Sequence, residues 1–138
     1  MKKTGVLLVV LSLLVFAHLA YAVTVMPDLR GTWTGKTTQA DIASPPVIDV
    51  TLTVTAALPA SATNKNFSGT LTIGVNTINV IVNNTREFYK VEVVPTDQGV
   101  ALGFGGALAW VPGPKIIVHG LGFNGHPYKG FILNKQGP

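Results

Sequence analysis

Residues 48–55 read IDVTLTVT, a strict alternation of apolar and polar side chains. Successive side chains of a β-strand point to opposite faces, so this period of two is typical of a strand with one buried face. The pattern returns in residues 67–73, FSGTLTI, and less cleanly in residues 78–82, INVIV, where Ile81 interrupts the polar face. No stretch after residue 22 has the period of a helix, and we therefore expect an all-β protein.

Turn-forming residues separate the expected strands. Pro, Gly, Asn and Asp gather between the apolar runs, where they favour tight turns. We expect eight strands, at about residues 31–38, 46–57, 66–73, 76–83, 86–94, 99–110, 115–122 and 128–134. Every connection is short enough for antiparallel neighbours, and none has room for a crossover helix. This order predicts an eight-stranded antiparallel up-and-down barrel, because closure removes exposed sheet edges; a two-sheet β-sandwich is the alternative.

Residues 1–22 have the three parts of a secretory signal peptide. Residues 1–3 (MKK) are a basic start, residues 6–17 are nearly all apolar, and residues 20–22 (AYA) place small side chains at positions −3 and −1 of a cleavage site. The apolar run is shorter than the ~20 residues that span a bilayer comfortably, which favours cleavage over a membrane anchor. We expect a single domain over residues 23–138, secreted or periplasmic, with a prokaryotic type of leader.

Removing this leader changes the composition of the chain. Residues 1–22 hold 16 of about 65 apolar residues, which leaves 49 in 116, or about 42%, an ordinary value for a soluble domain. The eight remaining basic and six acidic residues give a net charge of +2 in place of +4. These cations are scattered, so we expect no nucleic-acid partner. The chain has no cysteine, which excludes disulfides, a thiol nucleophile and thiolate metal ligands.

Short motifs in several expected strands carry a family resemblance. Residues 29–35, LRGTWTG, contain a Gly-x-Trp element that resembles the start of lipocalin-like and avidin-like barrels, where the Trp closes one end. Residues 67–71 are similar to the next such strand, residues 99–110 to a late avidin strand, and residues 128–133 to a closing strand. The resemblance implies a small barrel in which Trp33 is the plug.

The biotin-site residues of avidins are not matched. A polar residue two places after the Trp reaches the biotin ureido oxygen in that family, and Gly35 stands at that place here. A Tyr of the next strand serves the same ring, and the similar strand here has Leu71. Each missing buried hydrogen bond costs about 1–3 kcal/mol, so we do not expect biotin binding of avidin strength.

No arrangement of polar residues indicates a catalytic or metal site. His119 is expected in mid-strand and His126 in a turn, without a third ligand at a suitable spacing. The carboxylates after residue 22 are dispersed, and no serine lies in a Gly-x-Ser-x-Gly turn. Residues 103–106, GFGG, lack the lysine and following helix of a phosphate loop. We expect a non-enzymatic protein without a cofactor or metal.

The inward-facing residues of the barrel give the first functional hypothesis. An eight-stranded barrel is just wide enough to be filled by its own side chains or to hold one small ligand. The hypothesis is lipocalin-like binding of a small apolar ligand, with core filling as the structural alternative. The residues expected to wall the cavity are Trp33, Phe67, Leu71, Phe104 and Trp110.

One face of the strand expected at residues 99–110 gives the second hypothesis. One side of this strand is apolar and bulky, whereas the other carries only Gly and Ala, which lets another backbone approach closely. The group that approaches this face is a second subunit, a ligand or another sheet of the same chain. If it is a second subunit, the protein is a self-associating structural or surface-assembly subunit. The contact residues are then Ala101, Gly103, Gly105, Ala107 and Ala109.

A third hypothesis is an exported protein inhibitor that binds through the loops Ser61–Asn66 and Asn124–Tyr128.

An outer-membrane barrel is disfavoured because the polar strand faces carry Thr, Asp and Lys, so we expect no stable membrane insertion after cleavage. Asn66 and Asn83 begin Asn-x-Ser/Thr sequons near expected turns, and these are used only in a host with glycosylation machinery.

Overall fold

The computed structural model describes residues 27–61, 63–110 and 113–137. The expected signal peptide, residues 1–22, lies outside the described residues. Within the described ranges, no helix is long and apolar enough to cross a bilayer.

The regular secondary structure of the described residues consists of β-strands and one short 3-10 turn. The strands are β1 (Gly31–Thr38), β2 (Val47–Ala57), β3 (Asn64–Ile73), β4 (Asn76–Thr85), β5 (Lys90–Pro95), β6 (Leu102–Ala109), β7 (Lys115–Phe123), β8 (His126–Tyr128) and β9 (Phe131–Lys135). The turn, η1 (Glu87–Tyr89), lies between β4 and β5.

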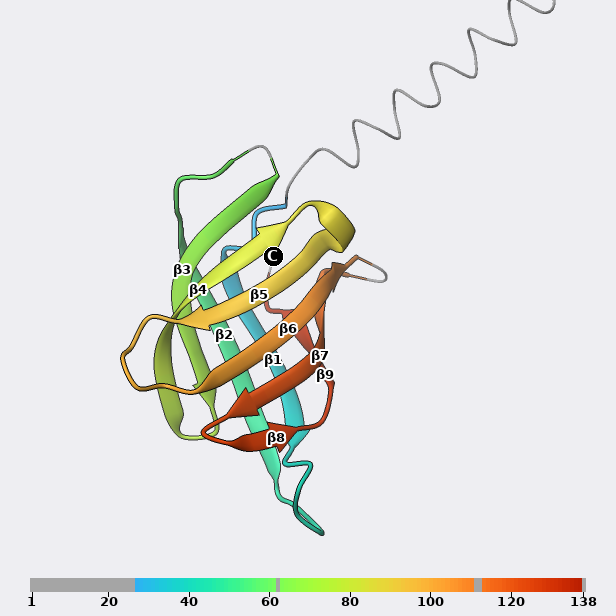
Figure 1. Cartoon of the computed structure of the whole chain (residues 1–138). Coiled ribbons are helices and arrows are strands. Elements are labelled where there is room, and N and C mark those ends of the chain that lie inside the picture. The colour runs from blue at the N-terminus through green and yellow to red at the C-terminus, as the bar shows by residue number, and fades with distance from the viewer. Residues whose placement is uncertain (1–26, 62, 111–112, 138) are drawn as a thin grey trace, which may run out of the picture.

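The strands close into a barrel (Figure 1). Each strand from β1 to β7 pairs with the next in antiparallel fashion, β7 pairs with β9, and β9 returns to β1. This ring confirms the expected eight-stranded antiparallel barrel and excludes a two-sheet sandwich. The ninth strand, β8, is a short addition that pairs with the end of β7.

Three expected strands differ from the observed ones. The strand expected at residues 99–110 begins only at Leu102 and ends at Ala109. The strand expected at residues 86–94 begins only at Lys90, because residues 87–89 form η1. The strand expected at residues 128–134 is split into β8 and β9 at Gly130, where a Cβ would lie 3.1 Å from the carbonyl oxygen of Val118. Gly130 therefore allows the chain between β8 and β9 to pass close to β7.

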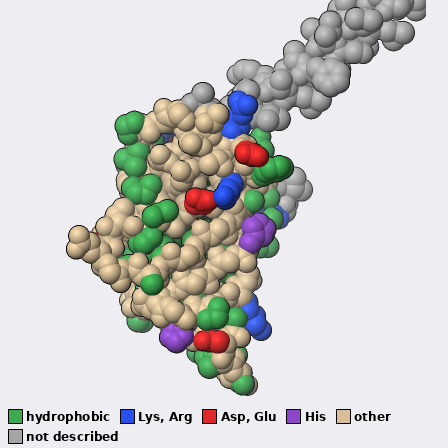
Figure 2. Space-filling view, viewed as in Figure 1, with side chains coloured by type: hydrophobic (Ala, Val, Ile, Leu, Met, Phe, Trp, Pro, Cys, Tyr) green, Lys and Arg blue, Asp and Glu red, His purple; other side chains and the backbone are tan. Residues whose placement is uncertain are grey.

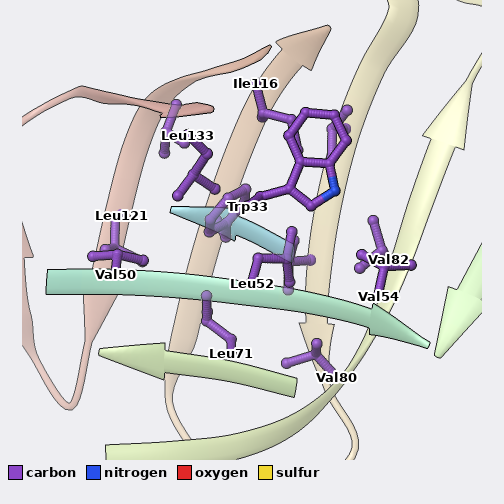
Figure 3. Packing of buried hydrophobic residues seen from close by; sticks show 14 of the residues in the cluster. Trp33, Val50, Leu52, Val54, Leu71, Val80, Val82, Ile116, Leu121 and Leu133 are labelled. Carbon is purple, nitrogen blue, oxygen red and sulfur yellow. The ribbon is translucent and has the colours of Figure 1, made fainter. Parts of the chain in front are cut away.

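Inward-facing side chains of successive strands meet in register and fill the barrel. Trp33 lies opposite Leu52, Leu52 opposite Leu71, and Leu71 opposite Ile78, so one row of apolar groups crosses four strands. All four side chains are buried, and each such burial stabilises the fold by about 1.5–3 kcal/mol. Figure 3 shows Trp33 among Leu52, Ile116 and Leu133. The core is the packed interior that the alternating pattern predicts.

Trp33 and Leu29 pack together inside the barrel. The Trp33 Nε1–H donates a 2.9 Å hydrogen bond to the carbonyl oxygen of Leu29, and both residues are 1% exposed. The Lys135 ammonium lies 5.8 Å from the centre of the Trp33 ring, within the range of a cation–π interaction. The segment before β1 is thereby fixed against the core.

Glycines let strands pass close to one another at the bends of the barrel. A Cβ at Gly35 would overlap the carbonyl oxygen of Ile132, and one at Gly69 would overlap that of Thr53. A Cβ at Gly106 would lie 2.7 Å from the Ile117 carbonyl oxygen. Glycines and bulges are the usual means of bending strands enough to close a barrel. These three glycines are explained by the fold of one chain.

Candidate functional site

Four glycines of β6 and β7 are not explained by the close approach of neighbouring strands. In β6 and β7, Gly103 lies opposite Gly122 and Gly105 opposite Gly120, so two cross-strand pairs carry no side chains. A Cβ at position 103, 105 or 120 would meet no atom within 4 Å, and one at 122 would meet a single backbone oxygen at 3.9 Å. The residues between them, such as Phe104 and Leu121, point into the core and are buried. The glycines therefore present bare backbone on the outer wall of the barrel.

These four glycines weaken the sheet of the isolated chain. None of them has a positive φ, so the backbone conformation does not require glycine. Glycine within a strand is unfavourable because of its unfolded-state entropy and because it provides no cross-strand side-chain contact. Elsewhere the outer wall is built of side chains, as where Thr34, Thr51 and Thr72 lie opposite one another on β1, β2 and β3. The bare glycine pairs of β6 and β7 contrast with this row of side chains.

A shallow groove of about 290 Å³ runs over part of this bare patch. The residues that line it are Phe88, Lys90, Gly105, Gly106, Ala107, His119 and Gly120. The pairing of β6 and β7 has a bulge between Gly105 and Gly106. His119 and Gly120 are therefore both exposed at the edge of the groove. Figure 2 shows the wall over β4, β5 and β6 with few charged side chains. The groove has a floor of backbone and small residues between an aromatic ring and an imidazole.

The turn η1 holds Phe88 at the rim of the groove. Phe88 and Tyr89 have φ angles of 55° and 48°, two consecutive non-glycine residues in the left-handed region, each of which costs about 1–3 kcal/mol. The ring of Tyr89 packs edge-on against Trp110, with centroids 4.7 Å apart. Phe88, by contrast, is 85% exposed. A strained turn therefore presents a large apolar side chain to solvent beside an apolar groove.

Charges of both signs lie next to the groove. The Lys90 Nζ is 2.7 Å from Glu92 Oε1, and Glu92 lies opposite Gly105 in the register of β5 and β6. The hydrogen bond to Glu92 raises the pKa of Lys90, so the ammonium stays charged across the physiological range. Both side chains are largely exposed and partly neutralise each other. The wall around the groove therefore has no strong charge of one sign.

The residues expected to wall a ligand cavity lie in two different places. Trp33, Phe67 and Leu71 are 1%, 0% and 0% exposed, and Phe104 is also buried in the same core cluster. Phe67 and Leu71 have no exposed surface and touch no space that a water molecule could enter, and all four side chains pack in the core of the barrel. Trp110 follows the last residue of β6 and is 45% exposed. The structure does not bring Trp110 together with the other four.

Most residues expected in a self-association face lie together. Gly103, Gly105, Ala107 and Ala109 alternate with the inward residues of β6, whereas Ala101 precedes the strand. The sequence did not predict that the facing glycines of β7, Phe88 and His119 lie on the same wall. The signal for the glycines was present, because residues 120–123 read GLGF and repeat the alternation of Gly with large apolar residues. Phe88 gave no signal, because nothing in the sequence marks the turn η1.

The other expected features are dispersed over the barrel. The segments expected as contact loops, Ser61–Asn66 and Asn124–Tyr128, lie at opposite ends of the barrel (Figure 1), and residue 62 lies outside the described residues. They are not wholly loops, because residues 64–66 belong to β3 and residues 126–128 form β8. Asn66 and Asn83, which were expected near turns, lie within β3 and β4, directly opposite each other and with buried side-chain oxygens. Among the described residues, no group of three His, Asp or Glu side chains is placed to hold a metal ion.

No family model, no curated protein and no solved structure matches this chain. The barrel has the strand number and topology of a small lipocalin-like barrel, and that likeness extends to the architecture alone. Gly35 illustrates the difference from avidins, because the carbonyl oxygen of Ile132 occupies the space that a polar side chain at position 35 would need.

Proposed function

We propose that this chain is an exported, non-enzymatic β-barrel that self-associates through the outer wall of β6 and β7. One observation carries the proposal: the cross-strand pairs Gly103–Gly122 and Gly105–Gly120 expose bare backbone that the fold of the single chain does not require. Such a surface lets a second molecule approach the sheet more closely than side chains allow. The exposed Phe88 beside it adds apolar area that favours association.

Lipocalin-like binding of a small apolar ligand is the second candidate function. The closed eight-stranded barrel favours it, since barrels of this size hold small ligands in some proteins. The filled interior speaks against it, because Phe67 and Leu71 leave no space beside them. Ligand binding remains a prediction, and self-association has the stronger support.

Export and self-association are tested with one preparation. The full chain is expressed in bacteria, the protein is recovered from the periplasm or the medium, and its N-terminus is sequenced. Cleavage after residue 22 predicts that the exported protein begins at Val23. An intact N-terminus at Met1 would overturn the export proposal.

Sedimentation velocity over a range of concentrations then tests self-association. We expect the sedimentation coefficient to rise with concentration, and we expect Gly105→Arg to abolish that rise because the arginine would stand on the bare patch. Thr51→Arg, which adds the same charge to the outer wall of β2, is the matched control and should associate like the unmodified protein. A monomer at every concentration, or association that is equal in both variants, would overturn the proposal.

A further inference from the structure

We infer that two copies of this chain form a two-fold symmetric dimer in which Phe88 of each copy occupies the groove of the other. The inference rests on the proposed self-association and specifies its partner and geometry. It is carried by the side-by-side placement of an exposed aromatic ring and an apolar groove on one wall of the barrel.

The groove is suited to an aromatic ring. Its floor at Gly105, Ala107 and Gly120 has at most a methyl group, so the flat face of a ring can lie directly on the backbone. Aromatic side chains placed over glycines in this way compensate for the missing side-chain contacts of a sheet. Among the described residues, none does so for Gly105 or Gly120 at close range, because a Cβ at either position would meet no atom within 4 Å.

Phe88 is the aromatic side chain that is placed to enter a neighbouring groove. It is 85% exposed, and it is held outward by the turn η1 rather than packed against its own barrel. Tyr89, the next residue, is fixed by its edge-on contact with Trp110, so the direction in which Phe88 projects is set by the fold. A projecting ring that is already oriented loses little conformational freedom when a partner covers it.

The positions of ring and groove determine the symmetry of the assembly. Phe88 is itself one of the residues that line the groove, so a single wall both provides the ring and receives one. When donor and acceptor surfaces lie on one wall, two molecules satisfy each other around a two-fold axis and the assembly closes. Donor and acceptor surfaces on opposite walls would instead produce an open filament. The geometry therefore favours a dimer over a fibre.

The charges beside the groove are compatible with this symmetry. Lys90 and Glu92 form an ion pair on the same wall. A two-fold axis that passes between these side chains, perpendicular to the line that joins them, sets each Lys90 against Glu92 of the other copy. A wall with charges of one sign would repel its own copy, whereas this wall presents one cation and one anion.

The apolar surface extends beyond the groove. Ala107 lies opposite Ile117 on β7, and Ile117 lies opposite Ile132 on β9, so an apolar row continues across three strands. Ile117 and Ile132 are both exposed. A stable dimer buries about 800 Å² on each partner, and this row provides area that the groove alone does not.

Native mass spectrometry and sedimentation equilibrium of the exported protein test the dimer, with three variants. Phe88→Asn removes the ring and suits the left-handed backbone at this position, so the barrel remains folded. Gly105→Leu fills the groove, and a Cβ at this position would meet no neighbouring atom within 4 Å. Phe88→Tyr keeps the ring. The control is Val75→Ser, which changes a 97% exposed side chain at the β3–β4 turn.

We expect a mass of two chains, and a dissociation constant raised at least tenfold by Phe88→Asn and by Gly105→Leu. Phe88→Tyr and Val75→Ser should dimerise like the unmodified protein. Circular dichroism of each variant verifies that the barrel is folded. Oligomers larger than two, or dimers that survive Phe88→Asn, would overturn this inference and leave the proposed self-association standing. A monomer at all concentrations would overturn both.

Discussion

Gly69 of β3 lies directly against Thr53 of β2, so close that a Cβ on the glycine would overlap the carbonyl oxygen of Thr53. The register of the two strands shifts at this point, between Val54 and Ala56, which marks a bulge. A bulge facing a glycine bends both strands, and such bends let a sheet close on itself. Gly69 therefore belongs to the closure of the barrel, unlike the glycines of the outer wall.

This contrast predicts opposite effects of one substitution at two positions. Gly69→Ala forces β2 and β3 apart and should lower the free energy of unfolding by about 1–3 kcal/mol, the usual effect of overpacking. Gly103→Ala places a methyl group in open space and should leave the stability unchanged or raise it by up to about 1 kcal/mol. Urea denaturation followed by circular dichroism measures both. Equal effects of the two substitutions would contradict the assignment of Gly69 to barrel closure.

The strands that could be predicted from the sequence are those with one wholly buried face. Val50, Leu52 and Val54 are all buried in β2, and the polar residues between them are not, which is the condition under which a period of two becomes visible. The prediction failed at residues 86–89, because the aromatic residues Phe88 and Tyr89 favour strands and no Gly or Asn announces their positive φ angles. Backbone strain of this kind is imposed by the tertiary structure and leaves no local mark.

The candidate site could be predicted only in part for a similar reason. Gly103 and Gly106 stand three residues apart in the same strand and look alike in the sequence. The structure separates them: Gly106 faces inward against the Ile117 carbonyl oxygen, whereas Gly103 faces open space. The strand opposite a glycine decides whether the glycine helps to close the barrel or exposes backbone. Which residue lies opposite depends on the register of the two strands, which the sequence does not show.

The two tryptophans should respond differently to substitution by phenylalanine. Trp33→Phe removes the donor to the buried Leu29 carbonyl oxygen and leaves a small cavity, so the free energy of unfolding should fall by about 1–3 kcal/mol. Trp110→Phe keeps an aromatic edge near Tyr89 on a half-exposed position and should cost under about 1 kcal/mol. Thermal unfolding measures the difference.

Fluorescence of the same variants provides an independent measurement. Trp33 is buried and should emit at shorter wavelength than the half-exposed Trp110. The Trp110→Phe protein, with Trp33 as its one tryptophan, should therefore have a blue-shifted spectrum that moves to the red on unfolding. A red-shifted spectrum of the folded variant would contradict the burial of Trp33.

Asp28 should contribute to stability only above acid pH. Its hydrogen bond with the Arg30 side chain, 2.6 Å from Nη2 to Oδ2, lowers the pKa of the carboxyl from the ordinary 3.8 to about 2. Because folding lowers this pKa, the stabilising effect is complete above pH 4 and is lost as the pH falls through about 2. The pair is half exposed, so Asp28→Asn should cost less than about 1 kcal/mol at pH 7.

Urea denaturation at pH 7 and at pH 2 tests this prediction. The difference in stability between the unmodified protein and Asp28→Asn should shrink at the lower pH, and an NMR titration should place the pKa of the Asp28 carboxyl well below 3.8. A difference that grows on acidification would show that the interaction with Arg30 does not hold the carboxylate ionised.

Leu71 offers a direct test of whether the barrel interior has room for a ligand. Its side chain is fully buried between Leu52 and Ile78, so Leu71→Ala should leave an apolar cavity and lower the free energy of unfolding by about 2–5 kcal/mol. Cavities of this kind stay dry and bind benzene, and a ligand that binds the folded state raises the melting temperature. Benzene should therefore raise the melting temperature of Leu71→Ala and leave that of the unmodified protein unchanged. Thr72→Ala, on the outer wall of the same strand, is the control and should behave like the unmodified protein. An equal benzene effect on the unmodified protein would mean that the interior already has space, and ligand binding would then replace self-association as the better supported function.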